Sequence, residues 1–283
     1  MTDYKIIFNI IVVCFNAGDK LKSTLDSIYS QEYWGMKVII KDGNSTDNSL
    51  INLIESNYFN GRIDDCTQIE STGDLGIYDA MNVATRFLSK DSNNEYTIFM
   101  NCGDSFADKQ VLGRVADYIE DCGVDEKVPY IFYGDQYNLL TNTAVSSAPN
   151  INDFTLFRNV PCHQVCFYDN RLFADRGYDI EYKVRADYEH FLYCYYEKKA
   201  ATKHMDILIS NYEGGGFSET KENRVLSAKE HKTITDYYMG RKAYRYRLIM
   251  ILTGAKIRTW LAESETFSGA YNSLKSYIYK LRR

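Results

Sequence analysis

The first 110 residues alternate short apolar runs with stretches in which apolar residues recur every three or four positions. A continuous apolar run is typical of a parallel strand buried on both faces, whereas the wider spacing is typical of an amphipathic helix. The strands predicted here cover 6–15, 38–40, a short segment ending at Ile69, and 96–100. The helices predicted between them cover 20–31, a segment capped by Asp47 that carries Leu50, Leu53 and Ile54, and 76–88. This alternation predicts βαβ units and a parallel sheet.

Beyond residue 110 the alternation is weaker, and the expected elements are more varied. They are helices over 111–119, 185–197, 219–238 and 241–261, strands over 130–135, 165–168 and 207–209, and an exposed hairpin or loop over 138–149. A Gly-rich loop covers 213–218, and loops of this kind commonly act as lids or ligand clamps. The whole pattern is that of an α/β protein with a helical end.

Polar turns follow the first, second and fourth predicted strands and hold Asn16, Asp42 and Asp104. Because right-handed crossovers place the carboxyl ends of parallel strands at one edge of the sheet, these residues are expected to converge there. No G-x-G-x-x-G follows the first strand and no GxxxxGK[ST] occurs, so bound phosphates would need a metal. Asp104 is the candidate metal ligand. The structural alternatives are a plain Gly-Asp turn at Asp104 and an Asx turn at Asp42 with Gly43.

The charge of the chain is unevenly distributed. The net charge is −5, but residues 241–283 hold ten basic and two acidic residues, a net +8 that leaves −13 on the first 240. The acidic body gives no reason to expect a nucleic-acid partner. In the basic segment, Leu248–Leu252 lies among arginines and lysines, which suits a helix on an anionic membrane. The alternatives are a helix that packs on the body or one that forms a homodimer.

The cysteines indicate a reducing compartment. All seven are scattered, and they form no CxxC pair and no zinc-like spacing. The apolar run 6–15 is interrupted by Asn9 and is followed by no small-residue cleavage site, so it does not predict a signal peptide. No apolar run reaches the roughly 20 residues of a membrane span. We therefore expect a cytoplasmic protein, in peripheral contact with the inner face of the membrane if the basic segment binds lipid.

Several short blocks, taken in order, resemble the family-two glycosyltransferases with the GT-A nucleotide-diphospho-sugar transferase fold. The blocks are Phe15-Asn16, Thr24–Ile28 with Gln31, Lys41–Asp47, Asp74–Asn82, Asn101–Asp104, His163-Gln164, Ala186–Tyr188 and Gly214–Ser218. The chain looks closest to the branch that builds bacterial polysaccharides such as colanic acid. Any one block is weak, but the ordered set covers most of the first 220 positions.

The resemblance implies a division of the chain. Residues 1–225 would form the GT-A domain, with a nucleotide-sugar half over 1–110 and an acceptor half over 111–225, and 226–283 would be a helical basic extension. The implied activity is an inverting transfer of a sugar from a nucleotide-diphospho-sugar, expected to be UDP-linked. The acceptor would be a hydroxyl of a growing surface glycan or a lipid-linked oligosaccharide.

The resemblance also implies roles for single residues. Asp187 would be the general base, and Asp104 would bind a Mn²⁺ or Mg²⁺ ion that bridges the phosphates. The implied nucleotide-sugar contacts are Phe15, Asn16, Asp42 (to the nucleoside), Asp74, Gly76, Asp79, Asn101 and Gly103. The implied acceptor or lid residues are His163, Gln164, Gly214 and Gly215. A carboxylate base suits a sugar hydroxyl, and a divalent ion suits a diphosphate leaving group.

Two positions depart from the family pattern. Asn101 and Gly103 stand where a second acid of the metal motif is expected, so the ion would depend on Asp104, water and phosphate, as Mg²⁺ tolerates. Met81 replaces an arginine that often precedes the helix asparagine, so that contact is lost or moved to Asp79 or Arg86.

Other functions and roles stay open from the sequence. A nucleotidyltransferase would usually carry a Gly-rich basic loop after the first strand, which 15–19 lacks. The missing acid near Asn101 gives some weight to a non-catalytic sugar or nucleotide binder that has kept the fold. Asp187 has a structural interpretation as a helix cap, and His163 as a core or supporting residue.

Overall fold

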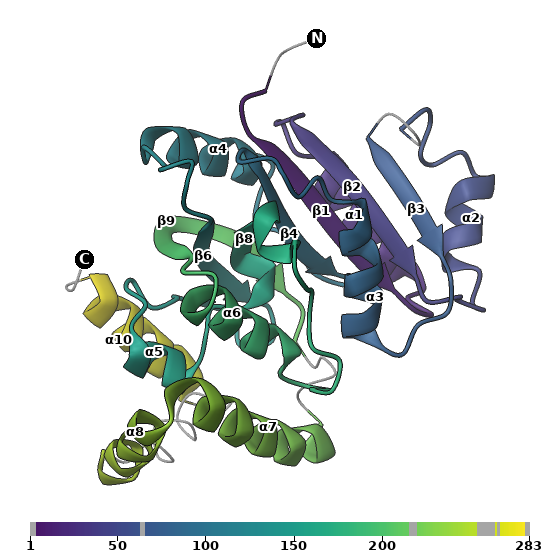
Figure 1. The fold of residues 1–283 in the computed structure, drawn as a ribbon. Coiled ribbons are helices and arrows are strands. Elements are labelled where there is room, and N and C mark those ends of the chain that lie inside the picture. The colour runs from purple at the N-terminus through teal and green to yellow at the C-terminus, as the bar shows by residue number, and fades with distance from the viewer. Residues whose placement is uncertain (1–3, 63–65, 215–219, 254–263, 265–266, 281–283) are drawn as a thin grey trace.

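One nine-stranded sheet runs through the molecule in the order β3-β2-β1-β4-β8-β6-β9-β5, with β7 paired to β6 (Figure 1). This computed structural model describes residues 4–62, 66–214, 220–253, 264 and 267–280. The strands are β1 (Ile7–Cys14), β2 (Met36–Asp42), β3 (Thr67–Ser71), β4 (Glu95–Asn101), β5 (Ser105–Phe106), β6 (Tyr130–Asn138), β7 (Thr143–Val145), β8 (Cys166–Asp169) and β9 (Ala201–Tyr212).

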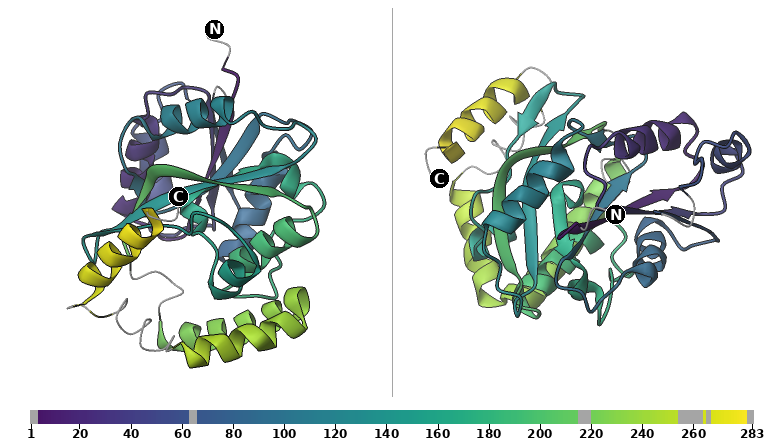
Figure 2. Two further views of the ribbon diagram at one scale, coloured as in Figure 1. Left: turned by 90° about the vertical axis from the view of Figure 1, so that its left-hand side faces the viewer. Right: turned by 90° about the horizontal axis from the view of Figure 1, so that it is seen from above.

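Helices cover both faces of the sheet. They are α1 (Asp19–Tyr29), α2 (Ser49–Glu55), α3 (Ile77–Ala84), α4 (Val111–Asp121), α5 (Asp153–Arg158), α6 (Ala186–Tyr196), α7 (Lys221–Met239), α8 (Arg241–Leu252) and α10 (Ser268–Lys280). Seen from above, α1 and α3 lie on opposite sides of the N-terminal strands (Figure 2). The C-terminal helices α7, α8 and α10 gather on the side away from α2 and β3 (Figure 1). The predicted α/β class is confirmed.

The N-terminal half forms the parallel part of the sheet. β1 pairs in parallel with both β2 and β4, and β2 pairs in parallel with β3. In this register Cys14 lies opposite Asp42, and Val13 lies opposite Asn101. The carboxyl ends of the three strands are therefore level, which confirms the expected convergence of their turns at one edge.

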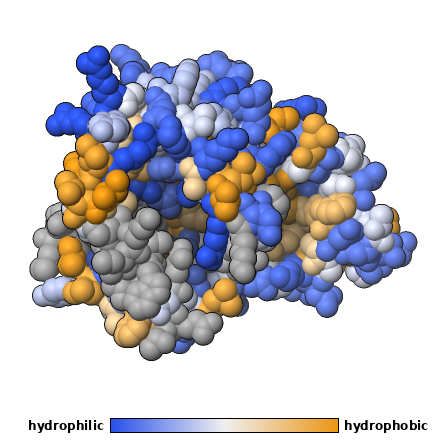
Figure 3. Space-filling model, turned by 90° about the horizontal axis from the view of Figure 1, so that it is seen from below, coloured by the Kyte–Doolittle hydropathy of each residue, from blue (hydrophilic) through white to orange (hydrophobic). Residues whose placement is uncertain are grey.

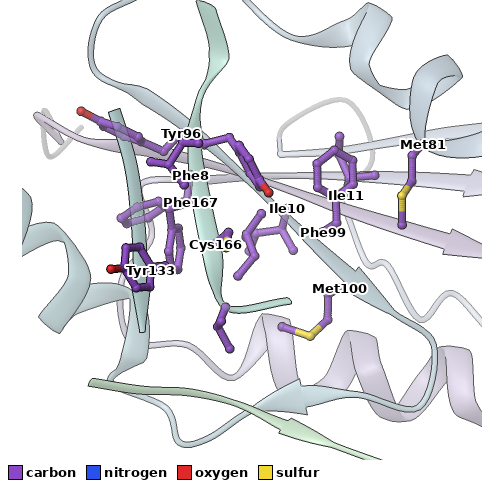
Figure 4. Close-up of a cluster of buried hydrophobic side chains, with 14 of the residues drawn as sticks. Phe8, Ile10, Ile11, Met81, Tyr96, Phe99, Met100, Tyr133, Cys166 and Phe167 are labelled. Atoms are coloured by element: carbon purple, nitrogen blue, oxygen red, sulfur yellow. The ribbon is translucent and has the colours of Figure 1, made fainter. Parts of the chain in front are cut away.

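The core explains why β1 is an uninterrupted apolar run. Seven of its eight residues are buried, because α1 and α3 cover its two faces. Figure 4 shows the adjoining cluster, which takes side chains from β1, β4, β6, β8 and α3. Within it the rings of Phe8 and Phe167 meet edge to face, with centroids 5.2 Å apart. On α1, the predicted apolar face of Leu21, Leu25 and Ile28 is fully buried.

The second half adds strands of mixed direction. β8 is antiparallel to both β4 and β6, and β5 is antiparallel to β9, whereas β6 and β9 are parallel. β6 and β7 form a hairpin, as predicted for 138–149. The sheet continues without a break from one half of the chain to the other, because β4 pairs with β8 at Tyr96 and Asp169.

Several boundaries differ from the sequence predictions. Asp47 is not the N-cap of α2: Asn48 holds that place in a left-handed conformation, and Asp47 instead accepts hydrogen bonds from the backbone N–H groups of Gly18 and Ser49. The strand predicted over 207–209 is the middle of the longer β9. The predicted helix 241–261 is helical as far as Leu252, and residues 254–261 lie outside the described residues.

Three elements were not predicted individually. α5 is only six residues long, too short for periodicity, but Asn152 and Thr155 form a capping box that marks its start. β5 has two residues and exists because β9 lies beside it. α10 was not predicted as a separate helix, although the extension 226–283 was expected to be helical and Tyr271, Leu274 and Ile278 follow helical spacing.

Candidate functional site

The turns after β1 and β2 are tied to each other by hydrogen bonds. The backbone N–H of Asn16 donates to Ser45 Oγ at 2.8 Å, and Asn16 Oδ1 accepts from the backbone N–H of Thr46 at 2.8 Å. Asn16 has a φ of 49°, a left-handed value that asparagine tolerates better than most residues. Beside it, the ring of Phe15 is 66% exposed and is free to stack on a flat ligand.

The carboxylate of Asp42 faces inward rather than toward solvent. Asp42 is 2% exposed, and its oxygens accept hydrogen bonds from the hydroxyl and backbone N–H of Ser45, from Ser71 Oγ and from Cys14 Sγ. Burial raises the pKa of Asp42, but the hydrogen bonds from Ser45 and Ser71 outweigh burial and bring the pKa below its usual value. The carboxylate thus stays ionised and fixes the loop that follows β2.

A buried lysine connects this loop to the segment before α3. Lys41 is fully buried, and its Nζ donates to the backbone carbonyls of Asp42 and Thr72 and to Asp74 Oδ2, at 2.7, 2.6 and 3.1 Å. Asp74 Oδ1 accepts the backbone N–H of Gly76, and Asp79 accepts that of Leu75. The predicted contacts Asp74, Gly76 and Asp79 therefore shape one loop at the sheet edge.

The turn after β4 brings Asp104 into the protein. Gly103 has a φ of 104°, and a side chain there would collide with Glu213, so the turn requires glycine. Thr24 of α1 fixes the turn, because its hydroxyl accepts the Gly103 N–H at 2.9 Å and donates to the Asp104 carbonyl at 2.8 Å. Asp104 itself is 4% exposed. Its carboxylate accepts from the backbone N–H of Glu213 at 2.9 Å and from Gln164 Nε2.

Burial sets the ionisation of Asp104. It raises the pKa of this carboxyl to about 6, although the hydrogen bond from the Glu213 backbone and the nearby His163 and Lys20 act in the opposite direction. Because burial disfavours the charged form of this carboxyl, a bound cation, which favours the charged form, would offset part of the cost of burial.

The residues around Asp104 fit a divalent ion in part. Asn101 Oδ1 is buried and has no hydrogen-bond partner among the described residues, so an acceptor oxygen lies at the end of β4 without a donor. Carboxylate and amide oxygens are ligands that Mg²⁺ and Mn²⁺ accept. No group of three or more His, Cys, Asp or Glu side chains suited to a metal occurs in the described part of the chain. Two protein oxygens would thus need to be completed by phosphate and water.

His163 and Gln164 bridge the two candidate carboxylates. They form a short 3₁₀ turn before β8, and Gln164 donates to Asp104 while His163 Nδ1 lies 3.3 Å from Asp187 Oδ2. On its other side, His163 Nε2 lies 3.1 Å from Asn101 Nδ2. A proton on Nδ1 satisfies both contacts, because the ring then donates to Asp187 and accepts from Asn101.

Asp187 lies in the first turn of α6, one position after its start, so it is not the N-cap of the helix. Its Oδ1 accepts from the backbone N–H of Tyr188 and from the Tyr78 hydroxyl, at 2.8 and 3.1 Å. The side chain is 24% exposed, so a substrate can reach it. Burial raises the pKa of Asp187, but the hydrogen bond from His163 and the charge of Arg185 outweigh it and bring the pKa below its usual value.

Tyr78 and Asn82 of α3 are supporting residues that the sequence reasoning missed. The Tyr78 hydroxyl reaches both Asp187 and the Val184 carbonyl, and Asn82 exchanges two hydrogen bonds with the backbone of Tyr178 at 2.7 and 2.8 Å. Both belong to the Asp74–Asn82 block and lie one helical turn apart, so they share a face. That spacing was the available signal.

The entry to the Gly-rich loop lies against the same turn. Glu213 pairs with Lys20 of α1 at 2.5 Å, and its backbone holds Asp104. Gly214 has a φ of 83° and lies close to Leu140, which leaves no space for a side chain. Gly215, predicted as a lid residue, lies outside the described residues.

The predicted site residues therefore form two clusters along one edge of the sheet. The first contains Phe15, Asn16, Asp42, Asp74, Gly76 and Asp79. The second contains Asn101, Gly103, Asp104, His163, Gln164, Asp187 and Gly214. β1 and β4 are neighbours in the sheet, so the clusters are adjacent. Over the residues described, no helix is both long and apolar enough to cross a membrane.

Comparisons with known proteins agree with this arrangement. Residues 9–169 match the family described as Glycosyl transferase family 2. A PGL/p-HBAD biosynthesis glycosyltransferase of Mycobacterium tuberculosis is 30% identical over 216 residues, which cover 76% of this chain and 80% of the relative.

Two of the solved structures that share the fold contain bound nucleotide-sugars. TarS 1-349 of S. aureus in complex with UDP-GlcNAc has a TM-score of 0.64 and 14% identity, over 85% of this chain and 70% of TarS. The mannosyltransferase PcManGT of Pyrobaculum calidifontis, in complex with GDP-Man and Mn2+, has a TM-score of 0.60 and 13% identity, over 98% of this chain and 81% of that enzyme. The GT-A fold prediction is confirmed.

Proposed function

The chain belongs to glycosyl transferase family 2 and is a glycosyltransferase, and from this premise we propose that it is a metal-dependent, inverting enzyme with Asp187 as the general base. The donor is a nucleotide-diphospho-sugar, expected to carry UDP. The acceptor is a hydroxyl of a growing surface glycan or a lipid-linked oligosaccharide, as in the polysaccharide-building branch that the sequence resembles.

One observation carries the proposal: two consecutive residues, His163 and Gln164, touch Asp187 and Asp104 respectively. A transferase must hold its acceptor base and its leaving-group site in a fixed relation, because misplacement slows the reaction steeply. Here a single short turn sets that relation. A protein that only bound nucleotide would not need an accessible carboxylate, such as Asp187, connected to the proposed phosphate-binding residue Asp104.

On the donor side, Asp104 and Asn101 are the residues proposed to hold Mn²⁺ or Mg²⁺. When bound there, the ion would stabilise the negative charge that develops on the diphosphate. The Asp104 carboxylate has lone pairs left after its two hydrogen bonds. The side-chain oxygen Asn101 Oδ1 would take the place of an oxygen of the usual second acid, but it carries no negative charge.

On the acceptor side, Asp187 takes the proton of the attacking hydroxyl. Its lowered pKa keeps it ionised at neutral pH, and Oδ2, whose one hydrogen-bond donor among the described residues is His163, is the less occupied oxygen. One base and one leaving-group site suffice for a single displacement, which inverts the anomeric centre. His163 keeps the carboxylate in place during attack.

The nucleoside is proposed to lie against Phe15, Asn16 and the loop after β2. The exposed Phe15 ring offers a stacking surface for a base. Direct contact of Asp42 with the nucleoside stays a prediction, since its acceptor positions are used by Ser45, Ser71 and Cys14. We propose that Asp42 acts by holding the loop that carries Ser45. In this scheme residues 1–110 serve the donor and 111–225 the acceptor.

The test is UDP release from UDP-sugars with saccharide acceptors, with and without Mn²⁺, after thermal-shift screening of UDP-, GDP- and dTDP-sugars. We expect metal-dependent release, abolished by Asp187→Asn with nucleotide binding nearly intact. Asp175→Asn is the matched control, because Asp175 is an exposed carboxylate paired with Lys198. Nucleotide-sugar binding without release would favour the non-catalytic binder. Formation of a nucleotide-sugar from a sugar phosphate would favour the nucleotidyltransferase.

The extension 226–283 is proposed to place the enzyme on the inner face of an anionic membrane. Tyr244, Leu248, Ile251 and Leu252 lie on one face of α8, and they are 63, 44, 74 and 84% exposed. Arg245 is exposed on the same helix. Orange side chains gather at the edge where Figure 1 places α8 and α10 (Figure 3). An apolar stripe with basic neighbours suits a lipid surface.

Flotation with phosphatidylserine-containing liposomes tests this placement. Leu252→Asp should weaken binding strongly, and Val225→Asp, at an exposed apolar residue of α7, should not. Equal flotation of both variants would contradict the placement. Sedimentation that shows a dimer, lost in Leu252→Asp, would instead favour a homodimer through this face.

A further inference from the structure

A cavity of about 200 Å³ lies among the β6–β7 hairpin, α5 and α10. Arg158 of α5 and Lys275 of α10 line it from different elements. Gln136 of β6 and Cys162 are also in the lining. One buried water needs only about 10–15 Å³, whereas pockets for drug-sized ligands begin at roughly 300 Å³. The cavity therefore fits a single small group, such as one substituted sugar unit.

Two cationic side chains face this one space. Arg158 is exposed, and over the described parts of the chain it forms no ion pair. Burial and the charge of Arg158 lower the pKa of Lys275, while Asp135 acts against them. Asp135 is itself held by His204 and by the backbone N–H of Ser147. Like charges that face one cavity favour an anion between them.

The cavity also offers a buried acceptor. Gln136 Oε1 is buried and has no hydrogen-bond partner among the described residues. Such an oxygen is costly to leave without a donor, and a ligand hydroxyl would supply one. The lining thus matches a ligand that carries both an anionic group and a hydroxyl.

Two residues in the lining of the cavity connect to the catalytic cluster. Cys162 lines it and is followed by His163, which contacts Asp187. Asn159, also in the lining, accepts a hydrogen bond from Arg185 at 3.0 Å, two residues before Asp187. A group bound here would therefore lie beside the segment that carries His163, which contacts the base.

We propose that this cavity is an acceptor subsite for an anionic sugar unit. Arg158 and Lys275 bind its phosphate or carboxylate, and Gln136 accepts a hydrogen bond from one of its hydroxyls. The proposal rests on the glycosyltransferase function argued above, since it concerns the acceptor of that same site. It gives the enzyme a means to select charged glycans over neutral ones.

The experiment measures binding of glucose 1-phosphate, glucuronate and glucose to the full chain by NMR titration. We expect at least one anionic probe to bind and glucose to bind far more weakly. Arg158→Gln and Lys275→Gln should each weaken the anionic probe by about tenfold, the loss of one charged hydrogen bond. Arg158→Lys should restore part of the affinity, and Lys229→Gln, at an exposed lysine of α7, is the control.

The probes also identify the anion. Tighter binding of glucose 1-phosphate assigns a phosphate, and tighter binding of glucuronate assigns a carboxylate. Binding that is unchanged in both Gln variants, or no binding to the parent chain, would overturn the subsite. UDP binding should be unchanged in Arg158→Gln, which separates the subsite from the donor site.

The subsite and the proposed function fail in different ways. Probe binding that depends on Arg158, in a chain that never releases UDP, would retain the subsite and contradict the transferase. Normal UDP release, together with probe binding that does not depend on Arg158 and Lys275, would retain the transferase and contradict the subsite.

Discussion

Replacing Asp104 with asparagine is expected to stabilise the fold while removing metal-dependent activity. The Asp104 carboxyl is 4% exposed, and burial raises its pKa from 3.8 to about 6. Asparagine has the same shape and no charge. The asparagine side-chain oxygen can still accept the hydrogen bond from the Glu213 backbone N–H. The side-chain amide of Gln164 can rotate by half a turn, so that its oxygen accepts a hydrogen bond from the asparagine NH₂ group.

The sign and size follow from linkage. The pKa of Asp104 is higher in the folded chain than in the unfolded chain, so protonation of this carboxyl favours the folded state. Its contribution to the free energy of unfolding is fully present below about pH 4 and is lost as the pH rises through about 6. Each pKa unit corresponds to about 1.4 kcal/mol, so the ionised carboxylate destabilises the native state by about 3 kcal/mol at pH 7 and above. Asp104→Asn should therefore match the parent near pH 4 and exceed it by about this amount at pH 8.

Urea denaturation of both chains between pH 4 and pH 8, without divalent ions, measures the difference. Asp108→Asn is an opposite-sign control, because the hydrogen bond from Arg114 lowers the pKa of Asp108 and its loss should destabilise the chain above pH 4. Added Mn²⁺ should stabilise the parent above pH 6 and leave Asp104→Asn unchanged. A stability difference that does not vary with pH would refute the burial argument.

Three further substitutions test the surrounding network. His163→Ala should move the acidic limb of the pH–rate profile to higher pH, because burial then raises the pKa of Asp187 without the opposing hydrogen bond from His163. An unmoved limb would show that His163 does not lower the pKa of the base. Tyr78→Phe should lower kcat by about tenfold with little change in KM, because Tyr78 only orients the base; an effect confined to KM would argue against it. Lys41→Met should lower the free energy of unfolding by about 3–5 kcal/mol, since it leaves the buried side of Asp74 without its cation, and urea denaturation that shows less than about 1 kcal/mol would contradict the ion-pair account.

The candidate base and its partners show how far sequence reasoning reached. Asp187 was singled out by resemblance, and the structure places it in the first turn of α6 with its side chain 24% exposed. His163 was left open between a supporting and a binding role, and the structure places it between Asn101 and Asp187. Tyr78 was missed, because its spacing from Asn82 shows only that the two share a helix face, whereas its contact with Asp187 spans 109 residues.

The sheet edge shows the converse case. The apolar runs of β1, β2 and β4 and the polar residues after them were enough to predict where Asn16, Asp42 and Asp104 would converge. This worked because strand burial and the handedness of crossovers are local or general rules. Asp47 was placed wrongly as a cap because such rules do not determine which of two neighbouring residues enters the left-handed conformation.

The sequence by itself thus determined the α/β class, the sheet edge at which the candidate site residues gather, and the residue types found there. Only the tertiary structure decided the direction of the side chains. It turned Asp42 inward, placed Gln164 against Asp104 across 60 residues and enclosed a cavity between Arg158 and Lys275. The physical reason is that periodicity reports which face of an element is buried, whereas contacts between distant elements depend on how all of them pack together.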